Sequence, residues 1–266
     1  MGIQGYLLDL DGTVHRGKKL IPGAREAVEA LRSRGRRILF LSNKPLYSRE
    51  HYANKLSHLG IPATVDDVIN SSFVLANFLA KEAPGAKVFA IGEPALLEEL
   101  QRAGLELSED PQKIDYVVAA FDRTFNYRKL NIAFQALRRG ARFYATNPDR
   151  TCPTEDGEIP DAAAVIAALE VTTGRKVEKV FGKPSKYVVK VALEMLRLQP
   201  EYCAMVGDRL ETDIRMAKEH GLTAILVLSG VTKTHDLRDS FWLPDYVLQS
   251  IAELPELDLK INGNKH

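Results

Sequence analysis

Short apolar runs alternate along this chain with segments in which apolar residues recur every three or four positions. The run at residues 6–8 predicts a short buried strand, and the spacing after Pro22-Gly23 predicts a helix with one apolar face. A second buried strand is predicted at residues 38–41, and the alternation continues to residue 248. This order of strands and helices is typical of an α/β fold with a mostly parallel sheet.

The pattern divides the chain into two blocks. Ala83-Pro84-Gly85 marks a break, after which a second set of strands and helices runs as far as Thr172-Thr173-Gly174. From residue 178 the pattern resembles that of the opening segment again. We therefore predict a Rossmann-like α/β core formed by residues 1–83 and 178–266, with an inserted α/β domain at residues 84–177.

Composition narrows the function classes. With 266 residues, 45% of them hydrophobic and 27% charged, the chain is an ordinary globular protein that can bury a full core. The 36 Lys and Arg residues nearly balance the 35 Asp and Glu residues, which leaves a net charge of +1. This balance argues against nucleic acid or a membrane surface as a partner recognised through bulk charge.

The expected compartment is the cytoplasm. Cys152 and Cys203 lie far apart without paired spacing, which favours a reducing environment over a disulfide framework or a zinc site. Met1 lies so close to the first strand that no signal peptide fits before it. The longest apolar run, Ala162–Leu169, is far shorter than a bilayer span, so no membrane partner is expected.

Two acids at the end of the first strand are the first candidate for chemistry. Asp9 and Asp11 are separated by one residue, and alternate residues of a strand point the same way. Two convergent carboxylates repel each other unless a cation or a shared proton relieves them. The pair therefore indicates a divalent metal site in which one carboxylate is free to act as a nucleophile. An ordinary turn is the alternative, because Asp and Gly are common turn residues.

Polar residues also follow the other predicted strands of the core. The carboxyl ends of parallel strands line one crevice, so residues distant in sequence are expected to meet there. Their types fit phosphoryl transfer, which needs a nucleophile and positive charge around the phosphate oxygens. The residues concerned are Asp9, Asp11, Ser42, Asn43, Lys183, Asp208 and Asp213.

These segments resemble, in order, the four motifs of the haloacid dehalogenase superfamily phosphatases, in the NagD-like or p-nitrophenyl phosphatase group. The resemblance spans nearly the whole chain. The matching segments are Asp9-Leu10-Asp11-Gly12-Thr13-Val14, Leu41-Ser42-Asn43, Gly182-Lys183-Pro184-Ser185 and Val206-Gly207-Asp208-Arg209-Leu210-Glu211-Thr212-Asp213.

The resemblance implies a role for each residue. Asp9 would attack phosphorus and form an aspartyl-phosphate, and Asp11 would protonate the leaving alcohol and then activate water. Mg²⁺ would bind Asp9, the backbone carbonyl of Asp11 and Asp208. Asp213 would support the waters of the metal or orient Lys183. The phosphoryl group would be held by Ser42, Asn43 and Lys183.

The insertion between Ser42 and Lys183 resembles the large α/β (C2-type) cap of some relatives. Within it, Asn147 and Asp149 are predicted to bind substrate, with Arg150 and Cys152 nearby, although an ordinary turn is the alternative. A similar Asn-x-Asp-Arg stretch occurs in a relative that acts on sugar phosphates, which favours that substrate class. Lys44 departs from the family pattern, since many relatives have a second Asn there.

The predicted function is Mg²⁺-dependent hydrolysis of small phosphomonoesters, with sugar phosphates favoured, through an aspartyl-phosphate. A phosphotransferase or mutase that passes the same group to an alcohol remains an alternative. A non-catalytic phosphate binder is disfavoured by the intact set of acids. The expected partners are a small-molecule phosphate ester and, through the cap, a second copy of the chain in a homodimer.

Overall fold

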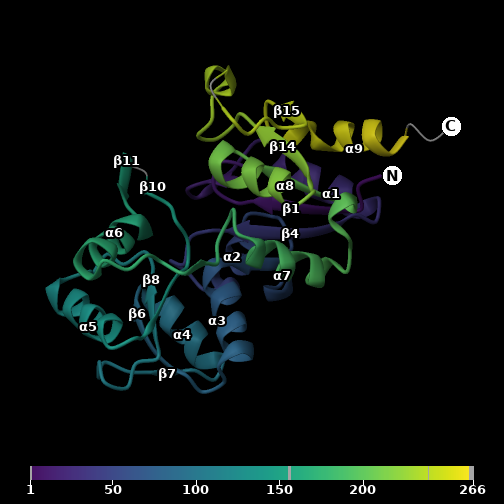
Figure 1. Ribbon diagram of the computed structural model, residues 1–266. Helices are drawn as coiled ribbons and strands as arrows, with labels where there is room; N and C mark the ends of the chain where they lie inside the picture. Colours follow the sequence, from purple (N-terminus) through teal and green to yellow (C-terminus); the bar gives the residue numbers. More distant parts are fainter. Residues whose placement is uncertain (1, 155–156, 239, 264–266) are drawn as a thin grey trace. The chain divides into compact units, whose positions relative to one another are not determined.

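The computed structural model describes residues 2–154, 157–238 and 240–263. The chain forms two compact units, each built on its own sheet (Figure 1). Unit 1 comprises residues 1–42, 50–69 and 183–266, and unit 2 comprises residues 43–49 and 70–182.

Unit 1 is built on a six-stranded sheet in the order β15-β14-β13-β1-β4-β5. The pairings of β1 with β13 and β4, of β13 with β14, and of β14 with β15 are all parallel. A short antiparallel hairpin, β2–β3, follows the first strand. The strands are β1 (Gly5–Asp9), β2 (His15–Arg16), β3 (Lys19–Leu20), β4 (Arg37–Ser42), β5 (Val68–Asn70), β13 (Cys203–Gly207), β14 (Thr223–Val227) and β15 (Tyr246–Leu248). The helices are α1 (Ala24–Ser33), α2 (Arg49–His58), α7 (Lys186–Leu196), α8 (Arg215–Glu219) and α9 (Leu254–Gly263).

Strand alternation explains how this sheet is covered on both faces. Tyr6 and Leu8 of β1 pack in one apolar cluster with side chains of α1, α2 and α9, while Leu7 between them is buried on the other face. On α1 the buried positions are Ala24, Ala27, Val28 and Leu31, the apolar face that the sequence predicts. Helices α7 and α8 contact β4 and β14. A strand covered on both sides needs a continuous apolar run, as β1 has.

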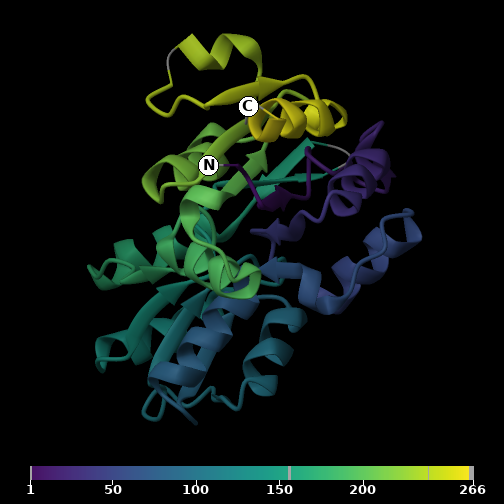
Figure 2. The ribbon, with the colours of Figure 1, turned by 90° about the vertical axis from the view of Figure 1, so that its right-hand side faces the viewer.

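Unit 2 repeats this architecture with a five-stranded sheet in the order β12-β9-β8-β6-β7. All four pairings within it are parallel, and β10–β11 forms a separate antiparallel hairpin. Figure 2 shows its strands, in blue-green, running beside one another. The elements are α3 (Ser71–Glu82), β6 (Lys87–Ile91), α4 (Pro94–Arg102), β7 (Glu106–Leu107), β8 (Tyr116–Ala119), α5 (Tyr127–Arg138), β9 (Arg142–Ala145), β10 (Thr151–Thr154), β11 (Gly157–Pro160), α6 (Ala162–Thr173) and β12 (Lys179–Val180). The predicted α/β fold with mostly parallel sheets is confirmed.

The two units divide at residues 70 and 182, whereas the predicted boundaries lie at residues 84 and 177. The difference arises mainly from α3, which the sequence assigns to the first block because it precedes Pro84-Gly85. In the structure Phe78 of α3 packs against Tyr144 and Phe181, with ring centroids 6.3 and 4.9 Å away, so α3 belongs with unit 2. That unit 1 is a catalytic core and unit 2 a cap stays a prediction.

Two hairpins and the last helix were not predicted. Strands β10 and β11 pair Cys152 with Ile159, and α9 is anchored by a buried acid, Asp258, to which the Tyr6 hydroxyl donates a hydrogen bond of 2.8 Å. Ser185 occupies the N-cap position of α7, but its side chain makes no capping hydrogen bond. In the part of the chain that the structure describes, no helix combines the length and apolar character that crossing a membrane requires.

Candidate active site

Asp9 and Lys183 form the centre of a buried charged cluster in unit 1. Asp9 is the last residue of β1, and Lys183 is the first residue of unit 1 after the chain returns from unit 2. The Lys183 ammonium donates a hydrogen bond to Asp9 Oδ1, and both residues are buried. A buried lysine needs a partner of opposite charge, so this contact fixes both side chains.

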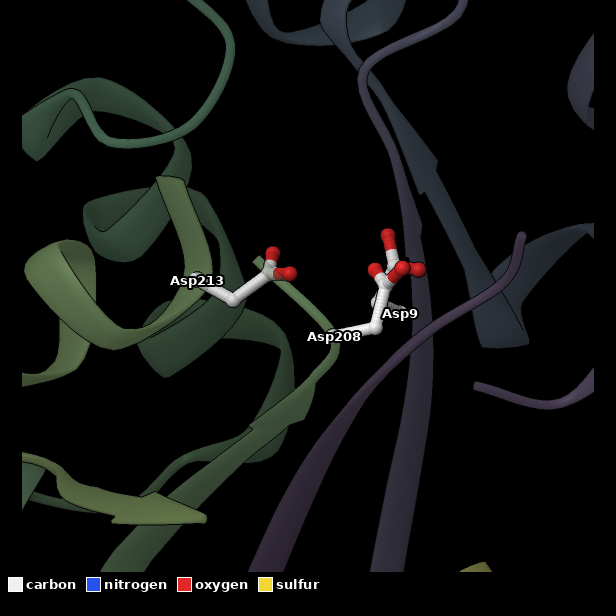
Figure 3. Close-up of side chains that lie close together, drawn as sticks. All are labelled: Asp9, Asp208 and Asp213. Carbon is white, nitrogen blue, oxygen red and sulfur yellow. The ribbon is translucent and has the colours of Figure 1, made fainter. Parts of the chain in front are cut away.

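Two further acids complete the cluster from the end of β13. Asp208 directly follows the strand, and Asp213 lies in the wide helical turn Leu210–Ile214 that comes next. Asp213 Oδ1 lies 2.6 Å from Lys183 Nζ, and Asp213 Oδ2 accepts a hydrogen bond of 3.1 Å from the Arg209 N–H. Figure 3 shows the Asp213 carboxylate pointing toward those of Asp9 and Asp208. One oxygen of each acid lies within 4.8 Å of one oxygen of the others.

A loop after β14 holds the Asp208 carboxylate. The Val231 N–H donates to Asp208 Oδ2 at 2.7 Å, and the Thr232 N–H donates to the Asp208 carbonyl at 3.2 Å. The Ser229 hydroxyl donates to the Gly12 carbonyl at 2.7 Å, which ties the same loop to the turn after Asp11. These three hydrogen bonds, all from neutral donors, help to fix the carboxylate and the turn beside it.

Glycines make room for these acids. A Cβ at Gly230 would lie 1.9 Å from Asp208 Oδ2, and one at Gly12 would lie 2.5 Å from the same oxygen. A Cβ at Gly207 would lie 2.3 Å from Asp213 Cγ. Gly12 also has a φ of 91°, a backbone conformation that side chains disfavour. The acids therefore sit in a space that a methyl group at any of these positions would fill.

The cluster contains more negative charge than its lysine balances. Burial raises the pKa of Asp9 well above its usual range, and the Asp213 and Asp208 carboxylates raise it further although Lys183 lowers it. Burial, with the charge of Asp213, raises the pKa of Asp208 to about 6. For Lys183 burial opposes the charged form, but Asp213 and Asp9 outweigh it and the pKa is raised. Carboxylates that share a buried site in this way form a donor set suited to a divalent cation.

Two other predicted residues of unit 1 lie at the same edge of the sheet. Ser42 ends β4, whose Leu41 pairs with Asp9, and it is buried. Asp11 lies two residues past Asp9, with its side chain 28% exposed and its Oδ1 3.5 Å from His15 Nδ1. The carboxylate of Asp11 is thus the most accessible of the predicted catalytic acids.

Asn43, Asn147 and Asp149 form a second group, within unit 2. Asp149 Oδ2 accepts hydrogen bonds of 3.1 Å from the side-chain amides of both Asn43 and Asn147. The Asn147 amide also donates to Asp161 Oδ1 at 3.1 Å. The predicted site residues therefore fall into two packed groups, and their combined action on one substrate stays a prediction. Of their neighbours, Arg150 is exposed and Cys152 is buried in β10.

Several residues around these two groups were not predicted from the sequence. The Ser229–Thr232 loop was not predicted, although Ser229-Gly230 follows a predicted strand, as the predicted site residues do. His15 was missed because a single histidine carries no spacing signal. Asp161 was missed because an acid before a helix is expected as a cap, and its carboxylate does accept from the Ala162 N–H.

Two family models match parts of the chain. Residues 6–106 match a family described as haloacid dehalogenase-like hydrolase, and residues 180–254 match one described as HAD-hydrolase-like. These two ranges contain Asp9, Asp11, Lys183, Asp208 and Asp213. The predicted superfamily is confirmed.

Individual relatives support the same assignment. The chain is 43% identical over 253 residues to sugar-phosphatase AraL of Bacillus subtilis, covering 95% of this chain and 92% of that one. It resembles the structure of a p-nitrophenyl phosphatase from Archaeoglobus fulgidus, with a TM-score of 0.92, 37% identity and coverage of 97% and 100% of the two chains. It also resembles a glycerol phosphate phosphatase of Mycobacterium tuberculosis solved in complex with magnesium, with a TM-score of 0.87, 34% identity and coverage of 95% and 76%.

Proposed function

Because the chain is a phosphatase of the haloacid dehalogenase-like hydrolase family, we propose that it hydrolyses small phosphomonoesters, with sugar phosphates as the main class, through an aspartyl-phosphate (an acyl phosphate) formed at Asp9. The observation that carries the proposal is the buried cluster of Asp9, Asp208, Asp213 and Lys183. The similarity to a sugar phosphatase over nearly the whole chain supports the substrate class.

We propose Mg²⁺ as the cofactor, held by the carboxylates of Asp9 and Asp208 and by the backbone carbonyl of Asp11. The raised pKa values of Asp9 and Asp208 support this assignment, because a divalent cation would relieve the repulsion between the buried acids. When bound, the cation supplies positive charge that stabilises the transferring phosphoryl group. Asp213, which is in contact with Lys183, would orient that lysine rather than bind the cation directly.

In the first step a carboxylate oxygen of Asp9 forms a bond to phosphorus while the bond from phosphorus to the leaving oxygen breaks. The Lys183 ammonium, already held between Asp9 and Asp213, places a fixed positive charge beside the oxygens that gain charge. The Ser42 hydroxyl supplies a neutral hydrogen bond to the same group.

Asp11 moves the protons. Its carboxyl gives a proton to the leaving alcohol in the first step and takes one from water in the second, when water attacks phosphorus and the bond to Asp9 breaks. The products are the alcohol and inorganic phosphate, and both acids return to their starting states. The partial exposure of the Asp11 side chain supports this role, because the group must reach both an alcohol and a water.

Asn43, Asn147 and Asp149 are proposed to contact the substrate, as the sequence predicts. The hydrogen bonds among them would hold the two amides in fixed orientations. A cytoplasmic location and a homodimer through the cap also stay predictions.

The proposal is tested by phosphate release from sugar phosphates and other phosphomonoesters, with Mg²⁺ and with a chelator. Asp9→Asn keeps the size of the side chain and removes the nucleophile, so we expect kcat to fall by at least about 10³-fold. Asp66→Asn, at an exposed acid of unit 1, is the matched control and should keep full activity. Full turnover by Asp9→Asn, or full activity in chelator, would refute the mechanism. Transfer of phosphate to an added alcohol instead of water would identify a phosphotransferase.

A further inference from the structure

His15 is a buried histidine fixed beside Asp11. It is the first residue of β2, directly after the tight turn that follows β1, and is 1% exposed. The N–H of His15 donates to the Leu10 carbonyl at 3.0 Å, and the His15 carbonyl accepts from the Gly12 N–H at 2.8 Å. The backbone on both sides of Asp11 is therefore bonded to the backbone of His15, and the ring of His15 is buried beside that turn.

Both ring nitrogens face charged side chains of unit 1. His15 Nδ1 lies 3.5 Å from Asp11 Oδ1. Lys55 Nζ, on α2, lies 3.1 Å from Nε2 and 3.4 Å from Nδ1. An ammonium can only donate hydrogen bonds, so the nitrogen that it faces must accept. With the nearer nitrogen, Nε2, as the acceptor, a neutral ring carries its hydrogen on Nδ1, which faces the carboxylate.

We propose that His15, oriented by Lys55, is a positioning residue for Asp11. The ring directs its Nδ1–H at Oδ1 of Asp11, which leaves the other oxygen of Asp11 to carry the proton to and from the reacting group. His15 itself exchanges no proton. The contact is long in the free protein, as hydrogen bonds of catalytic groups often are before substrate binds. This inference rests on the proposed role of Asp11 as general acid and base.

The choice of leaving group separates positioning of the acid from a merely structural role. An alkoxide must be protonated as it leaves, whereas p-nitrophenolate is stable enough to leave without much help. A residue that positions the acid therefore affects glycerol phosphate far more than p-nitrophenyl phosphate, while a residue that only supports the fold affects both equally. General acid catalysis contributes about 10²–10⁴-fold, so a poorly placed acid should lose a measurable part of that.

The test compares His15→Phe and His15→Asn with the unchanged full chain, saturated with Mg²⁺, on both substrates. His15→Phe keeps a ring and removes both nitrogens. We expect its kcat to fall about 10–100-fold on glycerol phosphate and less than about 3-fold on p-nitrophenyl phosphate, with KM unchanged on both. His15→Asn, whose amide can replace the Nδ1–H, should recover part of the loss. His58→Phe, at an exposed histidine of α2, is the matched control and should change neither substrate.

Asp11→Asn, measured beside them, separates this inference from the proposed function. If Asp11→Asn shows the selective loss and His15→Phe does not, the inference alone fails. If Asp11→Asn loses kcat equally on both substrates, the proposed role of Asp11 as general acid is wrong, and the inference about His15 fails with it. An equal loss on both substrates in His15→Phe would also overturn the inference. Should His15→Phe not fold, Lys55→Met, at a half-buried position, replaces it. We expect Lys55→Met to show the same selective loss of kcat on glycerol phosphate, to a smaller degree. An equal loss of kcat on both substrates would refute the inference.

Discussion

The two units bury acids at or just beyond the ends of their strands, but with different partners. In unit 1, Asp9, Asp208 and Asp213 share a single lysine, Lys183, and the pKa values of Asp9 and Asp208 are raised. In unit 2, Asp161 accepts hydrogen bonds from the Asn147 amide and the Ala162 N–H. Burial and the charge of Asp149 raise the pKa of Asp161, and these two hydrogen bonds offset only part of that rise. In unit 2, neutral hydrogen-bond donors therefore hold a buried acid that has a structural role. An excess of buried like charge lowers stability, so it indicates a site that awaits a cation or a substrate.

The largest expected effect concerns the space around the unit 1 acids. Gly230→Ala would place a methyl group 1.9 Å from Asp208 Oδ2, so the carboxylate must shift away from the Val231 N–H. We expect Mg²⁺ affinity to fall about 10–100-fold, the usual cost of disturbing the partners of a metal ligand. Isothermal titration of the metal-free protein measures it. Gly263→Ala, at a glycine with open space around it, is the control. An unchanged Kd would show that the glycine is not needed for the site.

A second test asks whether the unit 1 acids do destabilise the metal-free fold. The pKa of Asp208 is raised to about 6, above its unfolded value near 4, so between these pH values the folded state binds more protons than the unfolded state. Stability from this group therefore falls as pH rises from about 4 to about 6. In chelator at pH 7, the free energy of unfolding of Asp208→Asn should be roughly 1–3 kcal/mol larger than that of the unchanged chain, so the variant is the more stable protein. At pH 4 the two free energies of unfolding should agree.

Denaturant unfolding at both pH values measures this difference, with Asp66→Asn as the exposed control. If Asp208→Asn were less stable at pH 7, the carboxylate would be stabilising in the metal-free protein. The contrast between the two units would then be wrong.

For unit 2 the expectation is the reverse. Asn147 is fully buried, donates to Asp149 and Asp161, and accepts from the Thr146 hydroxyl at 2.8 Å. Asn147→Ala leaves these groups without a partner and should lower the free energy of unfolding by about 1–3 kcal/mol. The Mg²⁺ affinity of Asn147→Ala should equal that of the unchanged chain. The exposed control Asn54→Ala should keep both the Mg²⁺ affinity and the free energy of unfolding. A large loss of Mg²⁺ affinity would contradict the separation of the two networks.

The smallest effect is expected at a surface ion pair of unit 2. Arg128 pairs with Glu109, and both side chains are more than half exposed. Water screens such a pair, so Arg128→Ala should leave Tm unchanged in a thermal melt. A clear fall in Tm would show that surface charge also contributes to the stability of this unit.

Most of the fold could be predicted because its sheets are parallel and buried. Runs such as those of β1 and β13 are apolar throughout and end in a glycine or an acid, a signal that periodicity detects. The helix α9 could not be found in this way. It contains Pro255 near its start, and it is attached to the core by Asp258, which binds the Tyr6 hydroxyl and the Arg36 guanidinium. Leu254 and Leu257 are its buried apolar residues, and the buried Asp258 beside them interrupts the apolar face that periodicity would detect.

The candidate site shows the same limit. Asp9, Lys183 and Asp208 could be predicted because each follows a strand and each has a side chain suited to the chemistry. The Val231 N–H could not, since every residue but proline carries a backbone donor and only the fold directs this one to Asp208. His15 is comparable, because the role proposed for it depends on Lys55, which lies 40 residues away in sequence, on α2.

The division of the chain has a practical consequence for protein engineering. Unit 2 is assembled from two stretches, Asn43–Arg49 and Asn70–Gly182, because the chain returns to unit 1 between them. A gene fragment coding for the longer stretch alone would omit Asn43, whose amide donates to Asp149. Transplanting this module into another scaffold, or exchanging it between homologous enzymes, therefore requires two pairs of splice points instead of one.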